Sequence, residues 1–392
     1  MCAIIGTVNH ELNRLCLSRL YSRGPDYNSV YKNKNVNFAH ARLSVIDAEG
    51  GNQPMQSISG NSTIIFNGEI YNARELDTAY KSDTRVLLEY YEKHGIEKTL
   101  QDINGMFSFA IFDKKQNKIL IARDRLGVKP LFYYNKDNKL IFCSEINPIK
   151  DEIGTNNLSI NTTALSVYFR LFFIPSPITI WNEIESLKQG NYLIYDLKSN
   201  QLQQKTYWKL SQPERSKSNI SKLEELIEDA SIIRTRSDVP YSVFLSGGID
   251  STLITKYLSR FNKNLQTYTV EVQDPDLNEA EYSNIAATKF KTKHSSIKLK
   301  YKNILINHLR EMTTYFGQPF ADLSIIPYDL ISNQIGSRSV VALGGDGADE
   351  SFCGYNRYDN PTGMVEDLYR NKEFNLTPSQ DPKHFLLDNL PY

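Results

Sequence analysis

The apolar residues of this chain follow one pattern in its first half and another in its second half. In the first half, short runs rich in β-branched and aromatic residues are separated by Gly, Asn, Asp and Pro. Two stretches with helical spacing, Thr84–His94 and Ile160–Phe169, interrupt them. This half is therefore predicted to be an α+β domain with much antiparallel sheet. The predicted strands are Ala3–Val8, Val36–Ala39, Ser62–Phe66, Phe107–Phe112, Lys118–Ala122, Lys139–Cys143, Tyr192–Asp196 and Gln203–Trp208.

From residue 220 onward, short strand-like runs alternate with longer helical ones. Strands are predicted at Tyr241–Leu245, Leu265–Val272, His294–Ile297 and Ser339–Leu343. Helices are predicted at Ile220–Thr235, Ser251–Phe261, Glu279–Lys289, Tyr301–Phe316 and Ile325–Gly336. Such alternation predicts a parallel sheet with helices on both faces. Ligands of such sheets bind beyond the carboxyl ends of the strands.

The bulk properties fit an ordinary globular protein of two domains. The chain has 392 residues, enough for each half to have its own core. A polar stretch at 210–219 is the best linker candidate, so the predicted domains are 1–209 and 220–392. Lys+Arg and Asp+Glu both number 45. This balance argues against nucleic acid or an acidic membrane as a partner.

The apolar, cysteine and histidine patterns argue against several further classes. No apolar run approaches the length of a membrane span. The first residues, MCAIIGTVNHEL, do not resemble a secretory signal. The four cysteines form no CxxC pair and the histidines no HExxH motif, so a structural zinc site is not expected. Sparse, scattered cysteines fit a reducing cytoplasm.

A glycine-rich loop, SGGIDS at 246–251, directly follows the strand predicted at Tyr241–Leu245. Two glycines let the backbone turn tightly and present N–H groups to a ligand. With the start of the next helix these groups form a nest for an anion, most simply a phosphate. The spacing is neither GxxxxGK[ST] nor GxGxxG. A second loop, GGDGADE at 344–350, follows another strand. Two such loops at two strand ends favour a nucleotide site over a surface turn.

Cys2 is the candidate nucleophile of the first half. Removal of Met1 would leave a thiol and a free α-amine on one residue. That amine has a reference pKa of about 7.7–8.0, so it can act as the base for its own thiol. A cysteine that happens to be second is the simpler interpretation of this residue alone, and the assignment depends on its neighbours.

Several segments of the first half occur in the order of a known domain. They are MCAIIG, RGPD (23–26), ARLSVID (41–47), FNGEIYN (66–72), SDT (82–84), INGMFSFAIFD (103–113) and ARDRLGVKPLFYY (122–134). Together they resemble the N-terminal-nucleophile glutamine amidotransferase domain, over residues 1–195. The resemblance implies an αββα sandwich that hydrolyses glutamine at Cys2.

The residue types suit glutamine, a zwitterion with a side-chain amide. Arg42 can clamp the carboxylate with its planar fork, and Glu69 and Asp83 can take the ammonium group. Asn67 offers a side-chain N–H and Gly68 a backbone N–H to a tetrahedral oxyanion. By resemblance these match the family's positions, and the pocket would be lined by Leu43, Ser44, Val45 and Ile46. The alternative is that Arg42 and Glu69 are surface charges and Asn67-Gly68 a hairpin turn.

SGGIDS and GGDGADESFCGYNRY (344–358) resemble the synthetase domain of glutamine-hydrolysing asparagine synthetases. The resemblance implies a Rossmann-like ATP-pyrophosphatase domain in which ATP adenylates a carboxylate, most simply that of aspartate. Ammonia from glutamine would arrive through an internal channel and displace AMP. ATP would contact Leu245, Ser246, Gly247, Gly248, Asp250, Ser251, Val270, Gly344 and Gly345. Asp250 and Asp349 would hold Mg²⁺, and Asp346 would take part in amide formation. The alternative for these aspartates is a helix or turn cap.

Two features depart from the family pattern. Gly344 stands where the family usually has serine, and the family continues well beyond Tyr392. The chain is therefore expected to be either a fragment or a short form with an incomplete acceptor pocket. The leading hypothesis is a glutamine-dependent asparagine synthetase, with a homodimer left open. One alternative is a related enzyme with another carboxylate acceptor in cell-surface polysaccharide biosynthesis. The other is a glutaminase or nucleotide sensor that makes no amide.

Overall fold

The fold comes from a computed structural model that describes residues 1–211, 219–272, 278–298, 305–322, 324–336 and 338–355. These residues form two compact units. The first contains residues 1–211 together with 312–321, and the second contains the other described residues from 219 onward. Most of the predicted linker at 210–219 lies outside the described residues, as do residues 356–392 of the predicted second domain, so the domain limits stay a prediction.

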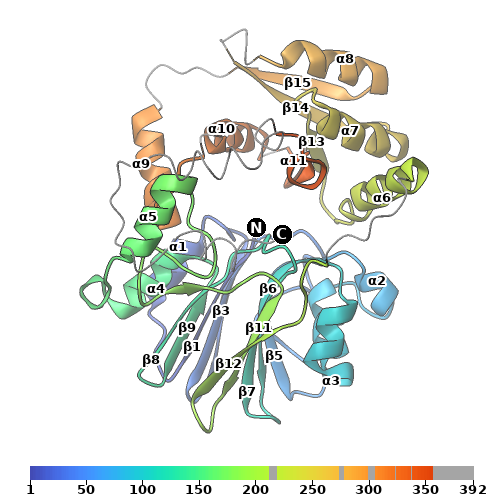
Figure 1. The fold of residues 1–392 in the computed structure, drawn as a ribbon. Coiled ribbons are helices and arrows are strands. Elements are labelled where there is room, and N and C mark those ends of the chain that lie inside the picture. Colours follow the sequence, from blue (N-terminus) through green and yellow to red (C-terminus); the bar gives the residue numbers. More distant parts are fainter. Residues whose placement is uncertain (212–218, 273–277, 299–304, 323, 337, 356–392) are drawn as a thin grey trace. The chain divides into compact units, whose positions relative to one another are not determined.

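The first unit contains two six-stranded sheets whose strands all pair antiparallel (Figure 1). One sheet has the order β10 (Glu185–Ser186), β8 (Phe132–Lys136), β9 (Lys139–Cys143), β1 (Ala3–Val8), β3 (Val36–Arg42) and β2 (Tyr27–Asn33). The other has the order β12 (Gln201–Thr206), β11 (Asn191–Asp196), β7 (Lys118–Arg123), β6 (Gly105–Asp113), β5 (Ser62–Ile70) and β4 (Met55–Gln56). All eight predicted strands are present, with ends that differ by a few residues.

Three apolar clusters stack these sheets and their helices into four layers. The central cluster joins side chains of both sheets, such as Ile4 and Phe38 from one and Ile65 and Phe112 from the other. A second cluster packs α3 (Asp83–Asp102) and the short α2 (Ala73–Leu76) on the outer face of the β5–β6 sheet. A third packs α1 (Arg14–Leu20) and α4 (Ile146–Ile153) on the outer face of the other sheet. The predicted αββα sandwich is confirmed. The predicted helix at 160–169 is α5 (Thr162–Leu171), which begins where the Asn161 side chain accepts the Ala164 N–H.

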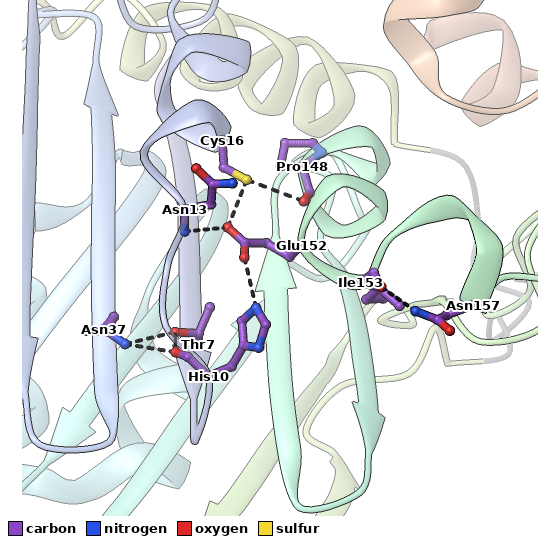
Figure 2. A network of polar contacts seen from close by, with 9 residues as sticks. All are labelled: Thr7, His10, Asn13, Cys16, Asn37, Pro148, Glu152, Ile153 and Asn157. Carbon is purple, nitrogen blue, oxygen red and sulfur yellow. Dashed lines mark hydrogen bonds and ion pairs between the residues drawn. The ribbon is translucent and has the colours of Figure 1, made fainter.

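A buried carboxylate ties α4 to β1 and α1. Figure 2 shows Glu152 between Asn13, Cys16 and His10. One of its oxygens accepts the Asn13 N–H at 2.8 Å and the Cys16 thiol at 2.9 Å, and the other lies 2.8 Å from His10 Nε2. Burial, and next the hydrogen bond to Glu152, raise the pKa of Cys16, so this thiol is an inert structural donor.

The second unit is built on a four-stranded parallel sheet of order β15 (Lys293–Lys298), β14 (Gln266–Glu271), β13 (Tyr241–Phe244) and β16 (Val341–Leu343). Its helices are α6 (Ile220–Ile233), α7 (Ile249–Phe261), α8 (Ala280–Phe290), α9 (Leu305–Phe316), α10 (Ile325–Ile335) and α11 (Ala348–Phe352). The end of α9 belongs to the first unit.

Alternate residues of β13 show that helices cover both faces of this sheet. Val243 packs with α7, and Leu245, just past the strand end, packs with α8. Phe244 packs with the α10 cluster on the opposite face. The parallel α/β prediction is therefore confirmed. Within the described residues, no helix has both the length and the apolar character that a membrane crossing requires.

Candidate functional site

Cys2 lies just before β1, next to the end of β3. Because Ala3 pairs with Ala41, the Cys2 thiol lies against the residues that follow β3. Its Sγ is 3.4 Å from the Leu43 nitrogen and 3.5 Å from the Leu43 oxygen. Burial raises the pKa of this thiol, opposed by the Leu43 hydrogen bond. A base is therefore needed to make the thiolate here, and the N-terminus is the nearest candidate.

The α-amine beside this thiol belongs to Met1, and burial lowers its pKa to about 6. Arg23 Nε donates to the Cys2 carbonyl at 3.1 Å and so fixes the backbone of Cys2. Arg23 opens the RGPD segment, in which Gly24 approaches β3 closely: a Cβ on it would lie 2.1 Å from the Ala41 carbonyl carbon. The segment then crosses to Ser44, whose N–H donates to Asp26 Oδ2 at 2.7 Å. RGPD therefore fixes both the nucleophile and the segment next to it.

Arg42 is buried, and it holds the loop that follows. Its Nη1 donates to the Ala48 carbonyl and to Asn52 Oδ1, and its Nη2 donates to the carbonyls of Ile46 and Asp47. The surface-charge interpretation is wrong for Arg42, which is 3% exposed. The remaining predicted pocket residues, Leu43, Ser44, Val45 and Ile46, are half-buried.

Asn67 has the polar atoms best placed to bind a ligand, because they are buried and unsatisfied. It is 1% exposed, and neither its Nδ2 nor its Oδ1 has a hydrogen-bond partner within the described residues. A buried amide left unsatisfied costs free energy, so such a group usually has a ligand or a catalytic task. Asn67 and Gly68 lie inside β5, opposite Ser108 and Phe107, so the hairpin-turn alternative is wrong. A side chain at Gly68 would collide with the Met106 carbonyl at 2.1 Å.

A hydrogen bond from the other sheet ties this part of β5 to β3. His40, two residues before Arg42, lies 3.0 Å through its Nε2 from the Phe66 carbonyl. Burial lowers the pKa of His40 to about 3, so the ring is neutral. Asn67 follows Phe66, and Leu43, which contacts the Cys2 thiol, directly follows β3. This contact therefore links the predicted oxyanion residue to the strand that ends beside the nucleophile.

The two predicted acidic residues are both buried. Glu69, on β5, is 8% exposed, so it is not a surface charge. Asp83 accepts the N–H groups of Ile70 and Thr84 at 3.0 and 2.8 Å. Burial raises the pKa of Asp83 to about 6 against these hydrogen bonds. The charge of Arg42 lowers the pKa of the Cys2 thiol and the charge of Asp83 raises it, both less than burial does.

A cavity of about 310 Å³ also lies within the first unit. Its walls are mostly aromatic side chains and prolines, and its polar wall joins Arg23, Glu145 and Tyr315. The Tyr315 hydroxyl donates to Glu145 Oε1 at 2.7 Å, and Arg23 Nη1 lies 3.4 Å from the same oxygen. Because Arg23 also bonds the Cys2 carbonyl, the cavity wall is coupled to the nucleophile.

In the second unit, SGGIDS forms a compact loop at the start of α7. The Gly248 N–H donates to Ser246 Oγ at 3.2 Å, and the hydroxyls of Ser246 and Ser251 are 2.9 Å apart. Gly247 has a φ of +98° and packs against Tyr282 and Ser283, so only glycine suits this position. The loop and the helix N-terminus form the geometry of an anion site.

The second glycine loop lies directly against the first. A Cβ on Gly345 would be 2.9 Å from Asp250 Cβ and 3.1 Å from the Ser251 nitrogen. The parallel pairing of β13 with β16 brings the two loops together, since both follow carboxyl ends of adjacent strands. Gly344, which stands where the family usually has serine, lies close to Asp346 in the same loop. Leu245 is buried and Val270 half-buried.

The acidic residues of this site differ in their surroundings. Burial, and next the charge of Asp349, raise the pKa of Asp250. Asp346 is exposed and accepts the Tyr328 hydroxyl at 2.6 Å. No cluster of three His, Cys, Asp or Glu side chains suited to a metal ion occurs in the described part of the chain. Mg²⁺ with nucleotides commonly uses only one or two carboxylates plus phosphate oxygens, so the mutual repulsion of Asp250 and Asp349 fits such an ion.

Tyr315, Glu145 and Lys129 were not singled out by the sequence patterns. Lys129 lies inside the ARDRLGVKPLFYY segment, and its burial is set by contacts with residues far away in the chain. Tyr315 sits on a predicted helix 170 residues from its partner Glu145. No local spacing could have signalled either contact.

Comparisons with known proteins match both halves of the chain. The family described as Glutamine amidotransferase domain matches residues 1–208, and the family described as Asparagine synthase matches residues 222–386. A Methanocaldococcus jannaschii protein with the provisional name asparagine synthetase (glutamine-hydrolyzing) 2 is 34% identical, and the match covers 91% of this chain and 76% of the relative.

Bacterial relatives match over a similar range. Asparagine synthetase (glutamine-hydrolyzing) 1 of Bacillus subtilis is 31% identical, over 93% of this chain and 60% of its own length. Asparagine synthetase B (glutamine-hydrolyzing) of Escherichia coli is 29% identical, over 91% of this chain and 65% of its own. The match thus spans less than two thirds of either bacterial relative.

Proposed function

Because the chain belongs to the family of glutamine-hydrolysing asparagine synthetases, we propose that it transfers ammonia from glutamine to an adenylated carboxylate, that of aspartate. The observation that carries the glutaminase half is the buried amide of Asn67, which has no hydrogen-bond partner among the described residues and lies on β5, the strand bonded to His40 of β3. The four free cysteines fit a reducing compartment, and we propose a cytoplasmic location.

Glutamine hydrolysis begins, in this proposal, after Met1 is removed. The free α-amine of Cys2 accepts the thiol proton, and the thiolate attacks the side-chain amide carbon of glutamine. Asn67 Nδ2 and the Gly68 N–H hold the oxyanion of the tetrahedral intermediate. The amine then protonates the leaving nitrogen, ammonia departs, and water hydrolyses the thioester to glutamate.

Glutamine recognition is assigned to Glu69 and Asp83 for the ammonium group and to Arg42 for the carboxylate. Both terminal nitrogens of Arg42 already donate to the 46–52 loop. The carboxylate must therefore compete with that loop or bind at the Nε–H. Arg42 would then couple glutamine binding to the shape of the loop.

The cavity beside Arg23 and Glu145 is the proposed first stop for ammonia. Its walls are largely apolar, and apolar walls favour neutral ammonia over ammonium because a charge there would lose its hydration. Arg23 joins this wall to the Cys2 carbonyl.

The second unit is the proposed site of carboxylate activation. The α-phosphate of ATP is attacked by the acceptor carboxylate, and pyrophosphate leaves toward the SGGIDS loop at the N-terminus of α7, where a helix end favours an anion. Asp250 and Asp349 would hold Mg²⁺, which would neutralise charge on the pyrophosphate. Ammonia then attacks the acyl-adenylate and releases AMP, a step in which Asp346 is proposed to take part.

The test uses the purified 392-residue chain with glutamine, ATP and aspartate. We expect glutamate, asparagine, AMP and pyrophosphate in equal amounts. Cys2→Ala should abolish glutamine hydrolysis and retain synthesis from added ammonia. Cys353→Ala is the matched control, because Cys353 is an exposed free thiol in the other unit. Glutaminase activity that survives in Cys2→Ala would refute the nucleophile. ATP consumption with no dependence on aspartate would refute the acceptor.

A further inference from the structure

Lys129 is a buried cation beside the nucleophile that the proposed reaction does not yet use. It is 4% exposed and lies at the end of the loop between β7 and β8. Its Nζ lies 2.8 Å from Met1 Sδ. Within the described residues it has no carboxylate within 4 Å, although a buried ammonium normally requires one.

The loop that carries Lys129 is held from both sides of its backbone. The Asp124 carboxylate accepts the N–H groups of Lys129 and Val128, both at 2.9 Å. Arg123 donates to the carbonyls of Lys129 and Gly127 at 2.9 and 2.8 Å. Two neighbouring charged residues are thus engaged in fixing one short loop, so the position of the Lys129 side chain is set by the fold.

The charges around Lys129 are those of the glutaminase site. Its pKa is lowered to about 8, first by burial and then by the charge of Arg23. Asp124, Cys2 and Glu69 act in the opposite direction. In turn, the pKa of the Met1 amine is lowered first by burial and then by the charges of Arg23 and Lys129, whereas Cys2 and Asp26 raise it. Lys129 is thus within electrostatic reach of the N-terminus.

Removal of Met1 changes what Lys129 faces. The Met1 side chain is the group that the structure places against Nζ, and it leaves with that residue. Lys129 then no longer has this contact, and the new N-terminus is the α-amine of Cys2, the residue that followed Met1. We propose that Lys129 is a positioning residue for glutamine hydrolysis: its charge disfavours protonation of the Cys2 α-amine and keeps that amine available as the base for the thiol.

This inference rests on the proposed glutaminase function. Two positive charges separated by several ångströms in a partly dehydrated site shift a pKa by about one unit or more. Loss of the Lys129 charge should therefore raise the pH at which the amine becomes unprotonated. At high pH the amine is neutral in either case, so the activity there should be retained.

The experiment measures kcat/KM for glutamine hydrolysis from about pH 5 to about pH 10 in the full chain, after mass spectrometry has confirmed loss of Met1. Lys129→Met removes the charge at nearly constant volume, and Lys129→Gln is a second neutral variant should the first not fold. Lys129→Arg restores the charge. Lys114→Met is the matched control. Lys114 is also partly buried, but it follows the C-terminal end of β6 and donates to the Gly60 carbonyl.

We expect the acid limb of the Lys129→Met profile to move up by about one pH unit, with wild-type profiles for Lys129→Arg and Lys114→Met. An unchanged acid limb would overturn the inference. So would an equal loss at every pH, which indicates a structural role. A wild-type chain that lacks Met1 but hydrolyses no glutamine would overturn the proposed function itself, a result distinct from both.

Discussion

Replacement of Asn67 by leucine should separate stability from catalysis. Asn67 is 1% exposed, and both polar atoms of its amide lack partners within the described residues. Leucine has the same branched side-chain shape, a somewhat larger volume and no polar atoms, so Asn67→Leu removes the unsatisfied groups without leaving a cavity. The same change removes the proposed oxyanion donor. Stability and activity are therefore expected to move in opposite directions.

The expected magnitudes follow from the burial of the amide. A buried polar group without a partner costs about 1–3 kcal/mol. The Asn67→Leu protein should therefore be as stable as the wild type or more stable, by up to about that amount. Loss of one oxyanion donor lowers kcat by about 10²–10³-fold.

Asn191→Leu is the matched control in the same sheet. Asn191 is 6% exposed on β11, and its amide is satisfied: it donates to the Gln189 carbonyl at 2.8 Å and accepts from Thr206 Oγ1 at 2.9 Å. Its replacement leaves these partners unpaired, so the first unit should lose about 1–3 kcal/mol. Glutaminase activity of the folded protein should be unchanged.

Hydrogen exchange of the β5 and β11 amides would report the stability of the first unit separately from that of the second. Steady-state glutamine hydrolysis at saturating substrate gives kcat. If Asn67→Leu destabilises the unit as much as Asn191→Leu does, the amide of Asn67 is already engaged in the free protein. If kcat is also unchanged, the oxyanion role is refuted.

Three further outcomes are expected. Tyr315→Phe removes the 2.7 Å hydrogen bond from the Tyr315 hydroxyl to the partly buried Glu145. It should lower the free energy of unfolding of the first unit by about 1–2 kcal/mol, measured by urea unfolding. An unchanged free energy would mean that water replaces the hydroxyl as the partner of Glu145. Gly345→Val places side-chain atoms against Asp250 and should weaken ATP binding at least about 10-fold by calorimetry, with glutamine hydrolysis as the unaffected control. Burial raises the pKa of Asp83 in the folded protein to about 6, above the usual aspartate value of 3.8. The folded state therefore binds the proton more tightly, and stability falls as pH rises from about 4 to about 6. Asp83→Asn should flatten that part of the stability profile and raise KM for glutamine; an unaltered slope would contradict the assignment.

The strands and helices near both sites could be predicted from local pattern alone. β1, β13 and the loop at 246–251 follow from an apolar run and the glycines after it, because these signals are short-range. The exceptions have a physical reason. The strand β2 (Tyr27–Asn33) was missed because it lies at a sheet edge with alternating exposed and half-buried polar residues, so its apolar signal is weak.

The sequence by itself determined the residue types of the two sites and their order along the chain: a cysteine at position 2, an Asn-Gly pair, and two glycine-rich acidic loops. Only the tertiary structure decided which of these groups are satisfied. In the structure Arg42 is bonded to the loop that follows it, Asn67 has no partner among the described residues, and Lys129 is buried against Met1. Hydrogen-bond satisfaction and burial depend on contacts between distant residues, such as the 128 positions that separate Met1 from Lys129, and no local pattern encodes them.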